Sequence, residues 1–147
     1  MEAALEEARM ALDEGEVPVG AVVVLRGRVI GRGHNQVESA CDPTAHAEVI
    51  AIGAACRTLR VPRLTGGTIY VSMEPCAMCA GAIVQARLAR LVYACSDPKA
   101  GYCGSLGNIA DDPRLNHRVA VTSGILTEAS AALVSGFFED LRARGKT

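Results

Sequence analysis

Two short stretches of this chain contain residue types that could bind a metal ion and activate water. The first holds His46 and Glu48, and the second, some thirty residues later, holds Cys76 and Cys79. Histidine and cysteine are common zinc ligands, and three protein ligands leave a fourth coordination position open for water, as in catalytic zinc sites. The two stretches therefore predict a hydrolytic zinc centre with His46, Cys76 and Cys79 as its ligands.

Glu48 favours a catalytic site over a purely structural one. Residues two apart lie about 200° apart on a regular helix, so His46 and Glu48 can serve one site only from a helix's first turn. Two thiolates cancel the charge of Zn²⁺, so water on such an ion is acidified less than in a three-histidine site. A nearby carboxylate then becomes important, first as proton acceptor and later as proton donor.

Two other interpretations of these stretches remain open. A structural zinc site would need a fourth ligand, but a single Cys-x-x-Cys is a weak motif and Glu48 would have no role. A redox-active Cys-x-x-Cys would use neither His46 nor Glu48. The candidates for a fourth structural ligand are His34, Cys41, Cys103 and His117.

The remaining sequence predicts the elements that position these stretches. Strands are expected at residues 17–25, 28–31, 68–73, 90–94 and 119–122. Helices are expected at residues 2–14, from residue 44 onward, at 75–87 with Pro75 as first helical residue, and at 126–143. This order indicates a single α/β domain over residues 1–147, with a five-stranded mixed sheet between helices in three layers.

Two segments carry more specific expectations. The helix that starts near residue 44 has apolar residues at helical spacing, which predicts that this face is buried. Its members are Val49, Ile52, Cys56 and Leu59. Residues 96–117 form a long loop with glycines and prolines, and loops of this length inside compact domains are usually functional.

Composition favours a cytoplasmic protein. Half of the 147 residues are hydrophobic, yet no run approaches the roughly 18 apolar residues that span a bilayer. The acidic N-terminus does not resemble a secretory signal, and a core of this size needs no disulfides. The four cysteines outside the Cys-x-x-Cys motif are expected to be buried free thiols: Cys41, Cys56, Cys95 and Cys103.

Charge is distributed unevenly along the chain. The net charge is −1, which argues against a strongly basic nucleic-acid binder. Residues 1–16 hold six acidic residues and one basic residue, a net charge of −5, so residues 17–147 carry ten acidic and fourteen basic residues, a net charge of +4. A modest basic face could therefore meet phosphates, although a solvated mixed surface explains the same counts.

The order His-x-Glu followed by Pro-Cys-x-x-Cys resembles the zinc-dependent cytidine and adenosine deaminases. The resemblance implies that His46, Cys76 and Cys79 bind one Zn²⁺ per subunit. It also implies that Glu48 is the general acid and base of hydrolytic deamination rather than a metal ligand.

Over nearly its whole length the chain is similar to the bacterial tRNA-specific adenosine deaminases. The matching segments are residues 16–22 (EVPVGAV), 42–48 (DPTAHAE), 74–82 (EPCAMCAGA), 116–119 (NHRV) and 124–126 (GIL). The resemblance implies a cytidine-deaminase-like fold, a homodimer, and a tRNA anticodon stem-loop as partner. It implies conversion of the wobble adenosine to inosine as the reaction.

The same resemblance suggests which residues contact the substrate. Asn35 resembles the family residue that hydrogen-bonds the purine, and an asparagine suits adenine's N7 edge; a simple turn asparagine is the alternative. Three residues of the long loop match family positions near the nucleotide backbone and sugar: Asp97, Lys99 and Ser105.

Two features of the last helix and its neighbours bear on the substrate. Phe137 and Phe138 are about 100° apart on a helix, so we expect one to pack inward and the other to stack on an anticodon base. The acidic pair Glu139-Asp140 stands where related tRNA deaminases tend to be basic.

A deaminase of a free base or nucleotide (cytosine, guanine or deoxycytidylate) with the same zinc chemistry is the alternative function.

Overall fold

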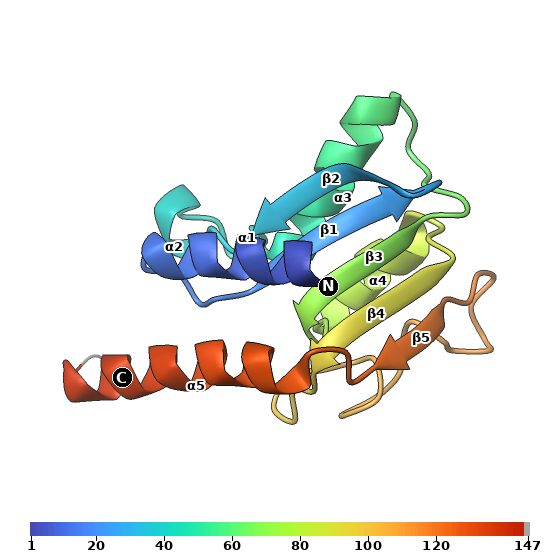
Figure 1. Ribbon diagram of the computed structural model, residues 1–147. Helices are drawn as coiled ribbons and strands as arrows, with labels where there is room; N and C mark the ends of the chain where they lie inside the picture. Colours follow the sequence, from blue (N-terminus) through green and yellow to red (C-terminus); the bar gives the residue numbers. More distant parts are fainter. Residues whose placement is uncertain (146–147) are drawn as a thin grey trace.

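In the computed structural model, which describes residues 1–145, a mixed sheet of five strands separates two layers of helices (Figure 1). The strands are β1 (Gly20–Leu25), β2 (Arg28–His34), β3 (Thr68–Met73), β4 (Arg90–Cys95) and β5 (Ala120–Ser123). Their order in the sheet is β2-β1-β3-β4-β5. Strand β1 runs antiparallel to both β2 and β3, whereas β3, β4 and β5 are parallel. The expected five-stranded mixed sheet is confirmed.

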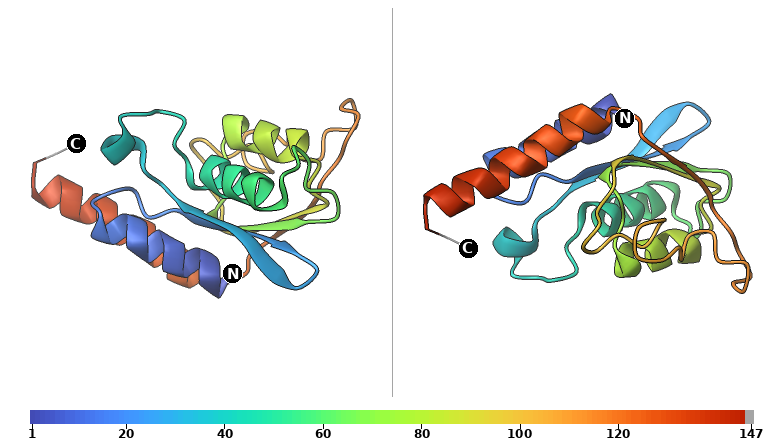
Figure 2. Two further views of the ribbon diagram at one scale, coloured as in Figure 1. Left: turned by 90° about the horizontal axis from the view of Figure 1, so that it is seen from above. Right: turned by 90° about the horizontal axis from the view of Figure 1, so that it is seen from below.

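The helices cover both faces of this sheet. On one face lie α1 (Glu2–Asp13) and α5 (Thr127–Ala143), and on the other lie α3 (Ala47–Leu59) and α4 (Ala77–Gln85) (Figure 2). The short helix α2 (Val37–Ala40) connects β2 to the approach of α3. The three-layer α/β/α architecture expected from the sequence is therefore confirmed, and α3 and α4 lie side by side on one face.

Two glycines of β2 allow α3 to lie unusually close to the sheet. A Cβ atom at Gly31 would come within 2.4 Å of the Ala51 carbonyl oxygen, and one at Gly33 within 2.5 Å of the Ala47 carbonyl oxygen. Three alanines of the helix lie against the strand: Ala47, Ala51 and Ala55 are fully buried. This close packing fixes the start of α3, and with it the residues of the candidate site.

The prediction of the buried face of α3 was correct only in part: Ile52 and Cys56 are partly buried and pack against the core. The expected face consists of larger residues, of which Leu59 is 37% exposed and the others are partly buried. The physical reason is the glycine surface of β2, which accepts alanines and leaves no room for branched side chains. Apolar periodicity alone does not show that the facing strand lacks side chains.

Several element boundaries also differ from those expected. Strand β2 continues to His34, because its glycines serve helix packing and do not end the strand. Strand β1 begins only at Gly20, after the irregular segment that contains Pro18. Helix α4 begins at Ala77 with Cys76 as its N-cap, so Pro75 precedes the helix instead of starting it. Helix α2 was not predicted.

The core lies between the sheet and the pair α3 and α4. Its largest fully buried side chains include Leu64, Ile69, Ile83, Leu88 and Leu91. All six cysteines are free thiols in the structure. Cys95 and Cys103 are buried as expected, Cys56 is partly buried, and Cys41 is exposed because it follows the short surface helix α2, which corrects its expected burial.

Membrane-spanning helices are absent from the part of the chain that the structure describes: none of its helices has the length and apolar character to cross a bilayer.

Candidate active site

The starts of α3 and α4 meet at the candidate metal site. His46 is the N-cap of α3 and has extended backbone angles (φ −78°, ψ 150°), and Cys76 is the N-cap of α4 with a similar conformation (φ −71°, ψ 177°). Neither side chain caps its own helix, so both are free to turn towards each other. Cys79 follows in the first turn of α4. Unpaired amides at helix starts favour negative charge, which here benefits the thiolates.

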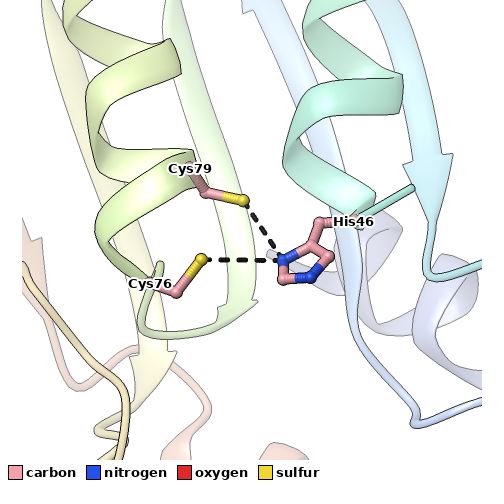
Figure 3. Close-up of side chains that lie close together, drawn as sticks. All are labelled: His46, Cys76 and Cys79. Atoms are coloured by element: carbon pink, nitrogen blue, oxygen red, sulfur yellow. Dashed lines mark hydrogen bonds between the residues drawn. The ribbon is translucent and has the colours of Figure 1, made fainter. Parts of the chain in front are cut away.

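One imidazole nitrogen faces both sulfurs (Figure 3). The Nδ1 atom of His46 lies 3.6 Å from the Cys76 sulfur and 3.4 Å from the Cys79 sulfur. A tetrahedral zinc ion with ordinary Zn–N and Zn–S bond lengths would hold N and S about 3.6 Å apart. The three atoms lie within 4.8 Å of one another. Both the donor set and its spacing therefore fit zinc.

The thiols of Cys76 and Cys79 differ in their pKa. The hydrogen bond with Cys79 lowers the pKa of Cys76 to about 5. The same hydrogen bond, together with burial, raises the pKa of Cys79. Cys76 is therefore the thiolate of the pair before any cation binds, and it is the more accessible of the two, since Cys79 is fully buried.

Glu48 lies in the first turn of α3, beside the sulfurs. Its side chain is buried, with 4% of the residue exposed. Burial raises the pKa of Glu48, against the opposing effect of a hydrogen bond with Cys79. A carboxyl group with a raised pKa next to a metal site is suited to taking a proton and returning it.

A cleft of about 810 Å³ opens over these residues. Seven of the residues predicted from the sequence line it: Asn35, His46, Glu48, Cys76, Asp97, Lys99 and Phe138. Walls come from the ends of β2 and β4, from the loop after β4, and from α5. The structure thus brings together the expected metal ligands, the carboxylate and most of the expected substrate contacts, although these segments are far apart in the sequence.

Asn35 lies at the rim of the cleft, directly after β2. Its amide nitrogen donates to the Val17 carbonyl oxygen at 3.4 Å, and its amide oxygen accepts from the Val37 backbone N–H at 3.4 Å. Both hydrogen bonds are long and therefore weak. The amide can exchange them for hydrogen bonds to a ligand at a small cost in free energy. This geometry is compatible with both the turn role and the purine-binding role.

Ser105 and Phe137 are not among the residues that line the cleft. The Ser105 hydroxyl donates a short hydrogen bond to the Glu74 carboxylate, on the inner side of its loop. The Phe137 ring packs edge-on against Phe138, with centroids 5.3 Å apart. Of the two phenylalanines, Phe138 lines the cleft and is 40% exposed, so it is the one placed for stacking.

Several charged residues that line the cleft were not predicted from the sequence to lie there, among them Glu16, Glu139 and Arg142. Glu16 is buried and its carboxylate accepts from the backbone N–H groups of Glu38 and Ser39, at the start of α2. Glu139 and Arg142 reach the cleft from α5. Glu16 is the first residue of segment 16–22, whose resemblance to the tRNA-specific adenosine deaminases could have indicated it. Glu139 and Arg142 of α5 belong to no such motif.

The fold and the site together define a deaminase that acts on nucleobases. Residues 1–142 match the family of MafB19-like deaminases. Among solved structures, the guanine deaminase from Nitrosomonas europaea superposes with a TM-score of 0.77 at 26% identity, covering 92% of this chain and 81% of that one.

Other similarities define the family more narrowly. The chain is 44% identical to the tRNA-specific adenosine deaminase of Bacillus subtilis, over 99% of its own length and 91% of the relative's. It is 47% identical to that of Aquifex aeolicus, over 97% and 93%. A structure from a study of A-to-I editing by tRNA:A34 deaminases superposes with a TM-score of 0.87 at 47% identity, over 90% and 96%. The chain belongs to the family of tRNA-specific adenosine deaminases.

Proposed function

We propose that this protein hydrolyses the wobble adenosine of a tRNA anticodon to inosine. The observation that carries the proposal is the buried Glu48 carboxylate beside the group of His46, Cys76 and Cys79, with Glu48, His46 and Cys76 lining one cleft. The chain that holds this site is 44% and 47% identical to two tRNA-specific adenosine deaminases along almost its entire length.

The metal-binding part of the proposal assigns one Zn²⁺ per subunit to His46, Cys76 and Cys79. Three ligands suit a catalytic zinc, whose open position supplies an acidified water molecule. The low pKa of Cys76, set by its hydrogen bond with Cys79, favours binding of a divalent cation at neutral pH. Two thiolates cancel the charge of Zn²⁺, so water bound to it is less acidified. The site therefore needs a carboxylate to accept and return the proton.

Glu48 moves the protons of the reaction. A water oxygen bonds to C6 of adenine while Glu48 accepts the water proton. Glu48 delivers that proton to N1, then takes the second water proton from the hydroxyl group now on C6 and passes it to the exocyclic amine. The C6–N6 bond breaks, and ammonia leaves with inosine as the product. The raised pKa that burial gives Glu48 allows it to hold the proton between these steps.

The cleft walls hold the nucleotide. Asn35 at the rim provides an amide for the purine edge, and Lys99 provides a positive charge for a phosphate. The exposed ring of Phe138 provides a stacking surface for a neighbouring anticodon base. Arg142, on the same helix as Phe138, adds a second cation at the cleft.

We further propose that the enzyme is a cytoplasmic homodimer. Exposed apolar side chains on α4 and the loop after β4 offer a surface for a second copy, since such groups gain from burial. They are Met78, Leu106 and Leu115. Light scattering of the purified protein tests the dimer, and a monomer at micromolar concentration would contradict it.

A panel of substrates tests the proposed activity. The zinc-loaded protein is incubated with an anticodon stem-loop that carries adenosine at the wobble position, and separately with free adenosine, cytosine and guanine. We expect inosine in the stem-loop and no comparable turnover of the free bases. Turnover of guanine or cytosine without inosine in the stem-loop would replace this proposal with a free-base deaminase, like the guanine deaminase of Nitrosomonas europaea.

A further inference from the structure

Glu74 is a buried carboxylate that the proposed chemistry does not use. It follows β3 directly and precedes the metal-binding segment by two residues, and it is 3% exposed. Its partners among residues 1–145 are hydrogen-bond donors and not cations, because none of the ion pairs in that range includes it. A buried charge needs hydrogen-bond donors or a cation to offset its loss of hydration. The donors to Glu74 therefore show which segment of the chain it holds in place.

Four donors of one loop converge on this carboxylate. Oxygen Oε1 accepts from the Asp97 backbone N–H at 3.0 Å and from the Ser105 hydroxyl. Oxygen Oε2 accepts from the backbone N–H groups of Cys103 and Ser105, each at 3.0 Å. A carboxylate has about four acceptor positions. They are all used by donors of the loop, so Glu74 serves as a hydrogen-bond acceptor for that loop.

The loop wraps closely around Glu74. A Cβ atom at Gly101 would lie 2.3 Å from the Glu74 carboxylate, so only glycine permits this approach. The Tyr102 backbone N–H donates to the Pro75 carbonyl oxygen at 2.9 Å. Gly101 also forms an isolated β-bridge with Cys76. The carboxylate therefore joins the loop to the segment that carries a metal ligand.

The same loop forms one wall of the cleft. Its residues 97–100 line the cleft, and they include Asp97 and Lys99. The Asp97 side chain accepts from the backbone N–H groups of Lys99 and Ala100, at 3.0 and 3.2 Å, which shapes the turn that carries the lysine. The position of this wall thus depends on the hydrogen bond between Glu74 and the Asp97 N–H.

We propose that Glu74 is a positioning residue, with Ser105 as its partner: together they set the cleft wall of residues 97–100 at the distance from the metal-binding segment that the nucleotide requires. This proposal rests on the proposed function for its substrate. It also assigns Ser105 a role through Glu74, in place of direct contact with the sugar or backbone.

Glu74→Gln tests the proposal with little change in shape. In the glutamine, an NH₂ group replaces one carboxylate oxygen. Where it replaces Oε1, the Ser105 hydroxyl can rotate to accept a hydrogen bond from the NH₂ group, but the Asp97 N–H is itself a donor and loses its acceptor. We expect the KM for the stem-loop to rise about tenfold or more, the usual effect of losing a hydrogen bond to a charged group. The kcat should stay within about twofold, because the wall binds substrate and transition state alike.

A conservative pair at Ser105 separates positioning from mere stability. Ser105→Ala removes the hydroxyl donor and should raise KM in the same direction, while Ser105→Thr keeps the hydroxyl and should restore the wild-type KM. Glu6→Gln, the same change at an exposed position of α1, is the matched control and should leave KM unchanged. All variants are compared at equal zinc content.

Hydrogen exchange gives a readout that does not need the substrate. In Glu74→Gln, the amides of residues 97–105 should exchange faster than in the wild type, with β1 and β3 unchanged. Normal KM and normal loop exchange in Glu74→Gln would overturn the proposal, and so would a loss confined to thermal stability. If the wild type fails to deaminate the stem-loop, the proposed function fails, and loop exchange alone still decides whether Glu74 positions the wall.

Discussion

The Nδ1 atom of His46 lies 3.4 Å from the Cys79 sulfur, although 33 residues separate them in the sequence. The contact joins the starts of two helices that lie side by side on one face of the sheet (Figure 3). Close packing of α3 on the glycines of β2 places the histidine, and the register of β3 places the cysteines. The candidate metal site is therefore a product of the packing of both helices on the sheet.

Loss of a metal ligand should abolish zinc binding without unfolding the chain. Cys79→Ser should reduce the zinc content from about one ion per subunit, measured by atomic emission, because a neutral hydroxyl is a poor ligand for this ion. Activity should fall with it. Chelation of the wild type should lower its melting temperature, since zinc stabilises the folded state that binds it. A chelated protein with full activity would contradict the assigned cofactor.

Removal of the Glu48 carboxylate should separate metal binding from chemistry. Glu48→Gln should retain zinc and lower kcat by about 10²- to 10⁴-fold, the usual contribution of a general acid and base. Single-turnover assays with the wobble-adenosine stem-loop measure this directly. Full activity in a zinc-loaded Glu48→Gln protein would show that another group moves the protons.

A methyl group at Gly33 should push α3 away from β2. Its Cβ would meet backbone atoms of Ala47 and Ala51 at 2.5 and 2.7 Å. We expect Gly33→Ala to lower the free energy of unfolding by about 1–3 kcal/mol, as overpacking of a core does, and to weaken zinc binding because His46 begins the displaced helix. Chemical denaturation and zinc titration measure the two effects.

Gly136→Ala is the matched control for that substitution. Gly136 lies inside α5, and a Cβ there meets no atom within 4 Å. Alanine should raise the free energy of unfolding by about 0.5–1 kcal/mol through helix propensity. Equal destabilisation by Gly33→Ala and Gly136→Ala would show that close contact with α3 is not the cause.

Stability should fall as the pH rises through the range in which His34 loses its proton. Its imidazole lies 2.9 Å from Glu7 and 3.0 Å from Glu14, and Arg32 lies 3.8 Å from Glu7. Burial lowers the pKa of His34, but the two carboxylates outweigh it and raise the pKa above its ordinary value.

The sign of this pH dependence follows from the raised pKa. The stabilisation is complete below the unfolded pKa of about 6.5 and is lost as the pH rises through the higher folded pKa. Thermal unfolding of the wild type from about pH 6 upward should show this loss, and His34→Gln should lack it. Identical pH dependence in the two proteins would refute the coupling of His34 to Glu7 and Glu14.

Much of the architecture was predictable because its signals are local. The strands β3, β4 and β5 and the helices α1 and α5 follow from apolar patterns, and the five-stranded mixed sheet follows from their order. The buried face of α3 was not predictable in the same way. It depends on the absence of side chains at Gly31 and Gly33 on another element, and a single helix sequence carries no information about its partner's surface.

The candidate site shows the same division. The candidate metal ligands and Glu48 stand in short motifs whose residue types indicate their chemistry, so the sequence alone was enough to propose them, and the structure brings the three candidate ligands together. The role of Glu74 was not predictable from the sequence, because its four donors come from a loop more than twenty residues later. Ser105 was assigned to the substrate by resemblance, whereas its hydroxyl is hydrogen-bonded to Glu74.

The most direct test of hydrolytic deamination follows the oxygen atom of water. The zinc-loaded protein is incubated with the wobble-adenosine stem-loop in H₂¹⁸O, and the nucleosides are analysed by mass spectrometry. We expect inosine at the wobble position with one ¹⁸O atom at C6, and labelling at least about a hundredfold slower in a parallel reaction with Glu48→Gln. Unchanged wobble adenosine after incubation with the zinc-loaded wild type would contradict it.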